Sequence, residues 1–224
     1  HAVTLLKKEV EVILVSSGAI ALGMDTLKRA KRPTQLSELQ ACAAIGQGKL
    51  MKAYETAFSN YGFHAAQVLL TQDGLQDRKK YLNARNTIEA LFTMKAVPIV
   101  NENDTVATEE IRFGDNDMLA AQVASLTEAN LLVFLSDIDG LYLRDKTIIR
   151  QIHSQEELKK YASHIHEKQS EKTVGGMKTK FQAAQIAMRS GIPIVLANGR
   201  DERVVERILK GEEVGSLFVP AERS

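Results

Sequence analysis

Short apolar runs alternate with helix-forming stretches along the whole sequence, and this alternation constrains the fold more than any other feature. Strands are expected at 10–15, 64–71, 97–100, 130–140, 192–199 and 216–219, and helices at 36–59, 77–94, from 117 onward, 155–166, 175–191 and 201–209. Such an order favours a mainly parallel sheet with helices on both faces. We therefore predict the α/β class, as a three-layer αβα sandwich, and one domain over residues 1–224.

Composition excludes several classes of function. The net charge is +1, so there is no bulk attraction to nucleic acid or to anionic membranes. No apolar run approaches the roughly 20 residues of a membrane span. The single cysteine, Cys42, lies in an Ala-rich helical stretch and is typical of a buried thiol in a reducing compartment. We expect a cytoplasmic protein that binds neither nucleic acid nor membranes.

Polar residues follow three of the expected strands. Ser16-Ser17-Gly18 ends the first strand, Asn101 to Asp104 follows the strand at 97–100, and Ser136 to Asp139 ends the strand at 130–140. Ligands of parallel α/β sheets bind at the carboxyl ends of the strands. The three polar strand ends therefore predict one ligand site along that edge.

The residues alone leave the role of each motif open. The small residues Ser17 to Ala19 can offer backbone N–H groups to an anion, or simply make a tight strand-to-helix connection. Asn101 to Asp104 is either a polar turn or a grip on a substrate ammonium through Asp104. Gly114 to Asp117 is either a helix cap or a group of acids that places lysines or Mg²⁺ near phosphates.

A glycine pair introduces the helix expected at 175–191. Gly175 and Gly176 immediately before a helix would let phosphate oxygens approach backbone N–H groups, with Lys180 about one turn further on. The stretch is not a Walker A loop, and the sequence contains no dinucleotide-binding fingerprint. The motif alone is weak evidence for a nucleotide site.

Taken together, these stretches resemble the glutamate 5-kinase family of the amino acid kinase superfamily. The matching segments are VSSGAIALG (15–23), AAIGQGKLM (43–51), LLTQDGLQDRKKYLNARNT (69–87), VPIVNENDTVATEEIRFGDND (97–117), LSDIDGLY (135–142) and GGMKTK (175–180). The resemblance implies an amino acid kinase-like fold. It also implies phosphorylation of the side-chain carboxylate of L-glutamate by ATP, with Mg²⁺ carried mainly by the nucleotide, as the first step of proline biosynthesis.

The resemblance also assigns roles to residues. Ser17, Asp104 and Asn116 would bind glutamate, with Gly18 and Ala19 lending backbone N–H groups. Asp117 would organise the catalytic lysines, and Lys180 would steady the transferring phosphoryl group. The residues implied to hold ATP are Ser136, Asp137, Val174, Gly175, Gly176, Met177, Lys178, Thr179 and Lys180. Protein ligands to the metal are not implied.

The sequence departs from the family in several places. The family's first strand, with a Lys-x-Gly motif, is expected upstream of His1, and the C-terminal domain resembling RNA-modification modules is not present before Ser224. The segments after Tyr142 and before Gly175 also look incomplete. Relatives form dimers or tetramers and are commonly inhibited by proline. A sister kinase with another acceptor, and a non-catalytic amino-acid or nucleotide sensor, remain alternatives.

Overall fold

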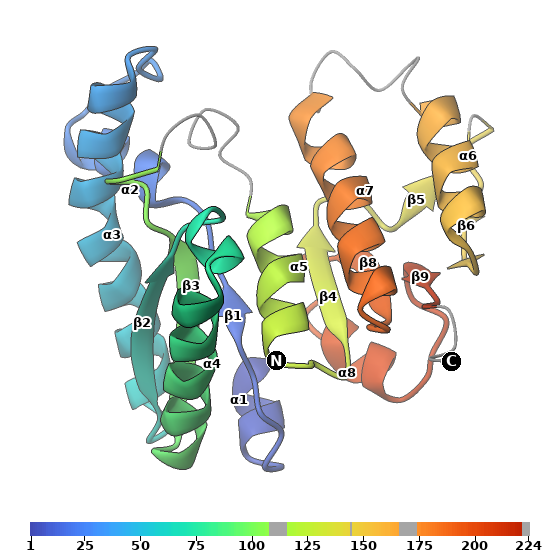
Figure 1. Ribbon diagram of the computed structural model, residues 1–224, viewed down its shortest axis with the longest axis horizontal. Helices are drawn as coiled ribbons and strands as arrows, with labels where there is room; N and C mark the ends of the chain where they lie inside the picture. The colour runs from blue at the N-terminus through green and yellow to red at the C-terminus, as the bar shows by residue number, and fades with distance from the viewer. Residues whose placement is uncertain (108–115, 144, 166–173, 221–224) are drawn as a thin grey trace. The chain divides into compact units, whose positions relative to one another are not determined.

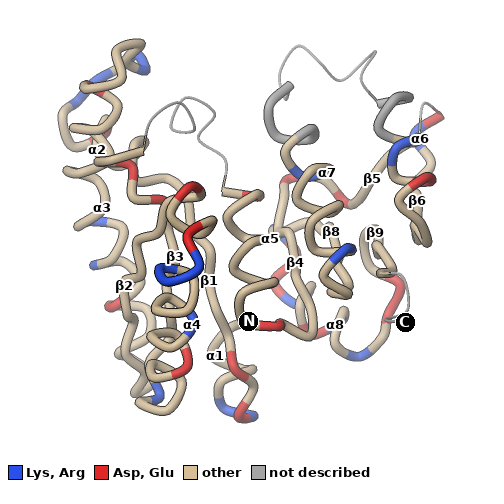
Figure 2. The backbone as a smooth tube through the Cα atoms, viewed as in Figure 1, with Lys and Arg blue, Asp and Glu red and all other residues tan. Residues whose placement is uncertain are grey.

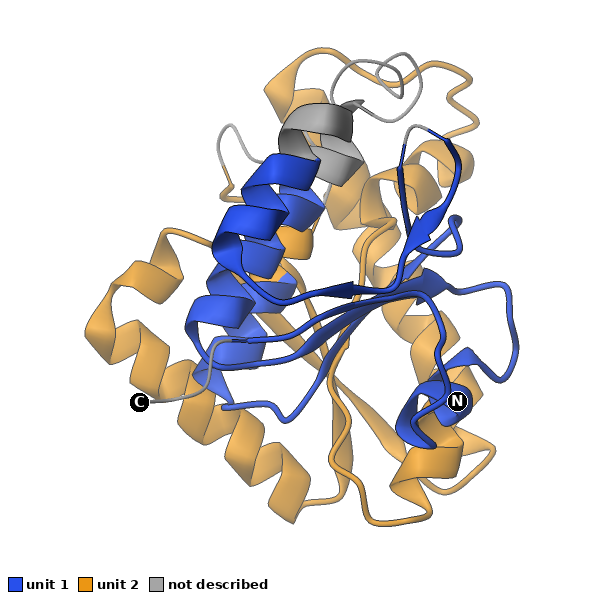
Figure 3. Ribbon diagram, turned by 90° about the vertical axis from the view of Figure 1, so that its right-hand side faces the viewer, with its two compact units in different colours: residues 1, 120–224 blue, residues 2–119 orange. Residues whose placement is uncertain are grey.

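The computed structural model describes residues 1–107, 116–143, 145–165 and 174–220, with the side chains of 162–165 and 174–178 left out. The chain divides into two compact units (Figure 3). Unit 2 comprises residues 2–119, and unit 1 comprises residues 120–224 together with His1. Each unit has its own sheet.

Unit 2 alternates helices and strands (Figure 1). Its elements are α1 (Ala2–Leu6), β1 (Leu14–Val15), α2 (Ala19–Thr26), α3 (Leu36–Ser59), β2 (His64–Leu70), the 3₁₀ turn η1 (Gly74–Gln76), α4 (Arg78–Thr93) and β3 (Ala96–Glu102). Helix α5 (Asp117–Leu126) begins in unit 2 and continues into unit 1.

The sheet of unit 2 is parallel, with strand order β1-β3-β2. Leu14 pairs with Ile99, and His64 pairs with Ala96. The central strand β3 is buried at every position after Ala96. Because both neighbours run parallel to β3, the carboxyl ends of all three strands lie at one edge of this sheet, as expected for a ligand-binding edge.

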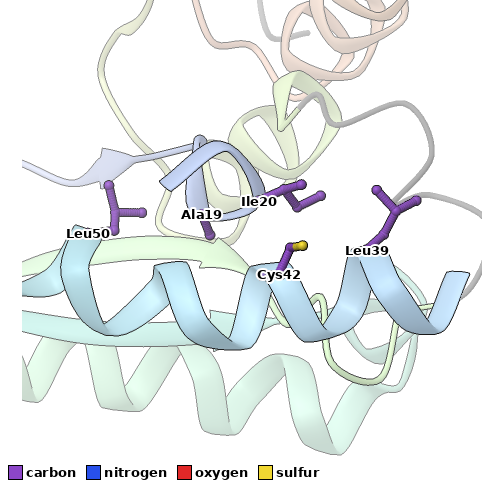
Figure 4. Close-up of a cluster of buried hydrophobic side chains, with 6 residues drawn as sticks. Ala19, Ile20, Leu39, Cys42 and Leu50 are labelled. Carbon is purple, nitrogen blue, oxygen red and sulfur yellow. The ribbon is translucent and has the colours of Figure 1, made fainter. Parts of the chain in front are cut away.

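Helices α2 and α3 pack unusually closely. Figure 4 shows Ala19 and Ile20 of α2 against Leu39, Cys42 and Leu50 of α3, all buried. Two glycines allow this contact. A Cβ atom on Gly23 would lie 1.8 Å from the Cys42 carbonyl oxygen, and one on Gly46 would lie 1.8 Å from the Ala19 carbonyl oxygen. Each helix therefore rests on the backbone of the other.

Unit 1 contains a mixed sheet of order β4-β8-β9-β7 and a small hairpin. Its elements after α5 are β4 (Leu132–Ser136), β5 (Leu141–Tyr142), β6 (Ile148–Ile149), β7 (Gln151–Ile152), α6 (Gln155–Ile165), α7 (Val174–Arg189), β8 (Ile194–Asn198), α8 (Val204–Leu209) and β9 (Ser216–Phe218). Strands β4 and β8 are parallel, whereas β8 and β9 are antiparallel. Val195 and Ala197 of β8 pack against Val204 of α8, and α7 packs against β8 as well.

Helix α7 buries the expected stripe, including Phe181, Ala184 and Met188. It stops as expected at Gly191, which has a left-handed φ of 72° that favours glycine. Its start differs from the prediction, because the helix begins at Val174 and the glycine pair lies within the first turn. The first turn of a helix has N–H groups without intrahelical partners, so glycines placed there remain compatible with a ligand that accepts from the backbone.

The α/β class is confirmed, and most expected elements are present with small shifts in their ends. The first strand was predicted too long. Only Leu14 and Val15 pair with β3, whereas Val10 and Glu11 are exposed. In contrast, β3 extends beyond the expected apolar run to include Asn101 and Glu102. Within the described ranges, no helix is both long and apolar enough to cross a membrane.

Candidate active site

The turn after β1 forms one wall of the candidate acceptor site in unit 2. The Ser16 N–H donates to the Val100 carbonyl at 2.8 Å, which continues the pairing with β3 for one residue. Gly18 then adopts φ 101° at the start of α2, a conformation that disfavours other residues. Ser17 and Gly18 are exposed, whereas Ala19 is buried. The turn thus presents small residues at a helix N-terminus, where backbone donors favour an anion.

A chain of side-chain amides lies beside this turn. Asn116 Nδ2 donates to Asn101 Oδ1 at 2.6 Å and to the Ser16 carbonyl oxygen. Asn101 Nδ2 in turn donates to Gln47 Oε1 at 2.8 Å. Asn101 is only 2% exposed, so these bonds satisfy a polar group that would be costly to bury alone. The network joins the start of α5, the end of β3, the middle of α3 and the turn after β1.

The turn after β3 carries Asp104. It is held by the Val106 and Ala107 N–H groups, which both donate to the Asn103 carbonyl. Asp104 is half-buried, and burial raises the pKa of its carboxyl group, an effect that Arg32 opposes. A half-buried carboxylate with a raised pKa is poised to gain from a cationic partner.

Helix α3 supports the site through residues that sequence reasoning missed. Tyr54 OH lies 2.8 Å from Ser16 Oγ, and Gln40 Nε2 donates to the Ala107 carbonyl at 3.0 Å. Gln47 belongs to the same group. The one available signal was the AAIGQGKLM segment, which was recognised as a motif without a role for its glutamine.

The motif before α5 is only partly visible. Asn116 and Asp117 are described, whereas Gly114 and Asp115 lie outside the described residues. Asp117 occupies the first turn of α5 and is 8% exposed. A buried acid in a first helical turn interacts favourably with the helix dipole. Its expected action on lysines stays a prediction.

Unit 1 carries the residues implied to hold ATP. Ser136 ends β4 opposite Asn198 of β8, and the Gly199 N–H donates to the Ser136 carbonyl at 2.8 Å. Asp137 follows and is exposed. Nearby, Asp139 accepts hydrogen bonds from Asn198 Nδ2 at 2.8 Å and Tyr142 OH at 2.9 Å.

These two bonds change the titration of their partners. The hydrogen bond from Asn198, followed by that from Tyr142, lowers the pKa of the Asp139 carboxyl group. The same bond to Asp139 raises the pKa of the Tyr142 hydroxyl. Asp139 is therefore a fixed anion at the end of β4, one that sequence reasoning grouped with the acidic strand end but did not assign to a role.

The second ATP segment lies on α7. Val174, Gly175 and Gly176 form the start of the helix, and Thr179 and Lys180 are half-buried about one and a half turns further on. The side chains of Met177 and Lys178 lie outside the described residues. The expected sites therefore separate by unit, with the glutamate set in unit 2 and the ATP set in unit 1.

Both units carry basic and acidic residues. Figure 2 shows both kinds along the tube of each unit, including the basic run Arg78 to Lys80 in unit 2. In the described part of the chain, no group of three His, Cys, Asp or Glu side chains gathers in a way that could hold a metal ion.

The chain belongs to the amino acid kinase family, whose family model matches residues 1–198. Among curated proteins it is similar to glutamate 5-kinases. It is 51% identical to that of Carboxydothermus hydrogenoformans over 95% of this chain, and 47% identical to that of Pseudomonas fluorescens over 97%. The glutamate 5-kinase of Thioalkalivibrio sulfidiphilus is 50% identical over 94% of this chain. These matches confirm the resemblance carried by the sequence motifs.

The chain spans 57% to 60% of the length of these relatives. A solved structure, the N-acetylglutamate synthase from Neisseria gonorrhoeae complexed with coenzyme A and L-arginine, matches with a TM-score of 0.68 at 16% identity. The match covers 97% of this chain and 56% of that protein. At this identity the likeness shows a shared fold and carries no inference about activity.

Proposed function

We propose that the protein transfers the γ-phosphoryl group of ATP to the side-chain carboxylate of L-glutamate, giving glutamyl 5-phosphate in the first step of proline biosynthesis. One observation carries this proposal: identity of 47% to 51% to proteins named glutamate 5-kinase, over 94% to 97% of this chain. The motifs of both half-sites lie within those matched lengths.

In this proposal unit 2 binds the acceptor. Asp104 and Asn116 hold the α-ammonium group, and Ser17 with the N–H groups of Gly18 and Ala19 holds carboxylate oxygens. The exposed turn at the start of α2 and the raised pKa of Asp104 support this division, because the first suits an anion and the second favours a cationic partner.

Unit 1 binds the donor in the same proposal. Ser136, Asp137 and the segment from Val174 to Lys180 hold ATP, and Lys180 neutralises charge on the transferring phosphoryl group. Asp117 positions the lysines. The glutamate carboxylate is already ionised near pH 7, so the reaction needs positioning and charge neutralisation rather than a general base.

Mg²⁺ is assigned to the phosphates of the nucleotide. The described residues place Asp137 exposed beside the end of β4, and they offer no cluster of three acidic or histidine ligands. This donor set suits an ion that keeps water and phosphate ligands, as Mg²⁺ usually does. When bound, the ion would supply charge neutralisation at the phosphates.

The proposal extends to the setting of the enzyme. We propose a cytoplasmic homo-oligomer, a dimer or tetramer, that is subject to feedback inhibition by proline. Size-exclusion chromatography with light scattering tests the first part, and the glutamate-dependent rate measured with and without proline tests the second.

The central experiment uses the full-length gene product with MgATP and hydroxylamine, which converts an acyl phosphate to a coloured hydroxamate. Glutamate, aspartate, N-acetylglutamate and carbamate are offered separately. Signal with glutamate alone supports the proposal, and signal with another acceptor instead replaces it with a sister kinase. Silence across the panel with ATP binding intact contradicts the proposal and favours a non-catalytic sensor.

A further inference from the structure

A backbone N–H group sets which atoms donate and which accept in the amide network of unit 2. The Glu102 N–H donates to Asn101 Oδ1 at 2.9 Å, and a backbone N–H can only donate. This fixes the oxygen of the Asn101 amide on that side. Asn101 Nδ2 must then face Gln47, whose Oε1 accepts at 2.8 Å. The Glu102 N–H thus sets which way the Asn101 amide faces, and Gln47 Oε1 is the acceptor that holds its NH₂ end.

The position of the Asn101 oxygen in turn sets the orientation of the Asn116 amide. Its Nδ2 donates to Asn101 Oδ1 and to the Ser16 carbonyl oxygen, both of which are acceptors. The two N–H bonds of the Asn116 amide are therefore used within the protein. Its Oδ1 is the atom left for a ligand, so Asn116 offers an acceptor and not a donor.

Gln47 terminates this network. Within the described part of the chain, its Nε2 is buried and has no hydrogen-bond partner, so the bond from Asn101 to Oε1 is what orients the side chain. Gln47 also lies next to Gly46, whose Cα hydrogen faces the Ala19 carbonyl. It therefore sits between the start of α2 and the end of β3, beside the residues assigned to the acceptor.

We propose that Gln47 is a positioning residue that acts through Asn101 to hold Asn116 with its carbonyl oxygen toward the acceptor, and that this selects acceptors with a free α-ammonium group. The proposal rests on the glutamate kinase function proposed above and names a determinant of its specificity. It makes Gln47 important without direct contact to the substrate.

The chemistry of the selection is simple. An ammonium group donates to Asn116 Oδ1 and is also attracted by Asp104. Glutarate has the same two carboxylates but lacks the ammonium group, so it would leave the Asn116 oxygen and the half-buried Asp104 without a cation. Glutarate should therefore be a much poorer acceptor than glutamate, and that preference should depend on Gln47.

The test compares kcat/KM for L-glutamate and glutarate in the hydroxamate assay, with full-length protein. Gln47→Met removes the acceptor atom while keeping side-chain length, and Gln47→Glu keeps an acceptor for Asn101. Gln67→Met, at an exposed position on β2, is the matched control. A change that merely loosened the fold would lower both rates together and leave their ratio unchanged.

We expect Gln47→Met to reduce the glutamate-to-glutarate preference by about tenfold or more, the factor that one hydrogen bond to a charged group supplies. Gln47→Glu should keep most of the preference, and Gln67→Met all of it. An unchanged ratio in Gln47→Met, or an equal loss in Gln47→Glu, overturns the positioning role while leaving the kinase proposal intact.

The wild-type protein supplies an independent check if Gln47→Met does not fold. Wild-type activity that is equal with glutarate and glutamate contradicts selection by the Asn116 oxygen. Absence of wild-type hydroxamate with glutamate contradicts the kinase proposal itself. The two failures are therefore distinguishable.

Discussion

The ends of the strands in units 2 and 1 carry similar polar residues in contrasting environments. In unit 2, Asn101 is buried, and its network reaches residues up to 100 positions apart in the chain. In unit 1, Asp139 is exposed and is bonded by Tyr142, three residues away, and by Asn198 of the adjacent strand β8. The first arrangement depends on tertiary packing and the second on neighbours along and across the sheet.

This contrast matches the ligands proposed for the two units. An amino acid is small and must be distinguished by a few atoms, which favours polar groups fixed in advance and shielded from water. A nucleotide brings several charges and its own metal ion, which a helix start with glycines and a lysine can accommodate. In the proposed division, unit 2 would select the acceptor and unit 1 would neutralise charge.

The largest expected effect comes from Gly46→Ala, which tests whether the organisation of unit 2 depends on contact between helix backbones. The added Cβ would lie 1.8 Å from the Ala19 carbonyl oxygen, so α2 must move. We expect a loss of more than about 3 kcal/mol in the free energy of unfolding, measured by urea denaturation.

Gly48→Ala is the matched control for this substitution, because a Cβ at Gly48 meets nothing within 4 Å on the same helix. It should stabilise the protein by about 0.5–1 kcal/mol through helix propensity. Equal stability of the two variants would show that α2 can shift freely and that the contact between the helix backbones does not organise unit 2.

Lys180→Ala tests the role of charge in unit 1. The substitution should lower kcat by about 10²- to 10³-fold, because charge on the transferring phosphoryl group loses a preorganised partner. The affinity for glutamate should change little. Lys159→Ala, at an exposed position on α6, is the control. Equal losses in kcat and in glutamate affinity would indicate that Lys180 supports the fold.

Asp104→Asn tests selection in unit 2. Removing the charge should raise KM for glutamate by about 10-fold or more, since a hydrogen-bonded ion pair with the ammonium group becomes a neutral contact. The KM for ATP should stay the same. The exposed Asp25→Asn variant in the same unit is the control. Unchanged glutamate affinity would remove Asp104 from the acceptor site.

The smallest expected effects are on how the free energy of unfolding depends on pH, and they have opposite signs for Asp104 in unit 2 and Asp139 in unit 1. Burial raises the Asp104 pKa, so its charged form opposes folding at pH 7. Asp104→Asn should therefore be more stable than wild type at neutral pH, and the difference should vanish as the pH falls through the folded pKa to below about 4.

Asp139 should behave in the reverse manner. Hydrogen bonds lower its pKa, so its contribution is present at neutral pH and is lost as the pH falls through that lowered value. Asp139→Asn should be less stable than wild type at pH 7, with the gap closing in acid. Urea unfolding of both variants and of wild type between pH 7 and pH 3 measures these differences. If both variants were more stable than wild type at pH 7, or both less stable, the expected contrast would be wrong.

The sequence predicted an element well where its own hydrophobic periodicity sets its length. The long helix α3 begins at Leu36 and ends at Ser59, as expected from its periodicity. The two-residue strand β1 was overestimated because its end is set by pairing with β3, which lies far away in the chain. The β5–β6 hairpin was missed, since two-residue strands have too few residues to show alternation.

The motifs of the candidate site could be proposed from the sequence, whereas the residues that support them could not. Ser17 and Asp104 stand out in the sequence because polar residues there follow an apolar strand, and Asn116 stands out because it lies between two acids before a helix. Gln47 and Tyr54 do not, because a polar residue on a helix usually faces solvent and nothing in its spacing names Asn101 or Ser16 as a partner. Their roles come from tertiary structure alone.

The parallel pairing of β1 with β3 has a consequence for biosynthesis. Leu14 leaves the ribosome long before its partner Ile99, and Ser16 long before Asn116. During synthesis, β1 and the turn that follows it stay unpaired until β3 and Asn116 are made, whereas α2 and α3 can already pack against each other. The proposed acceptor half-site is therefore completed late, and arrest of translation before Asn116 should yield a nascent chain in which α2 and α3 are formed but the proposed site is incomplete.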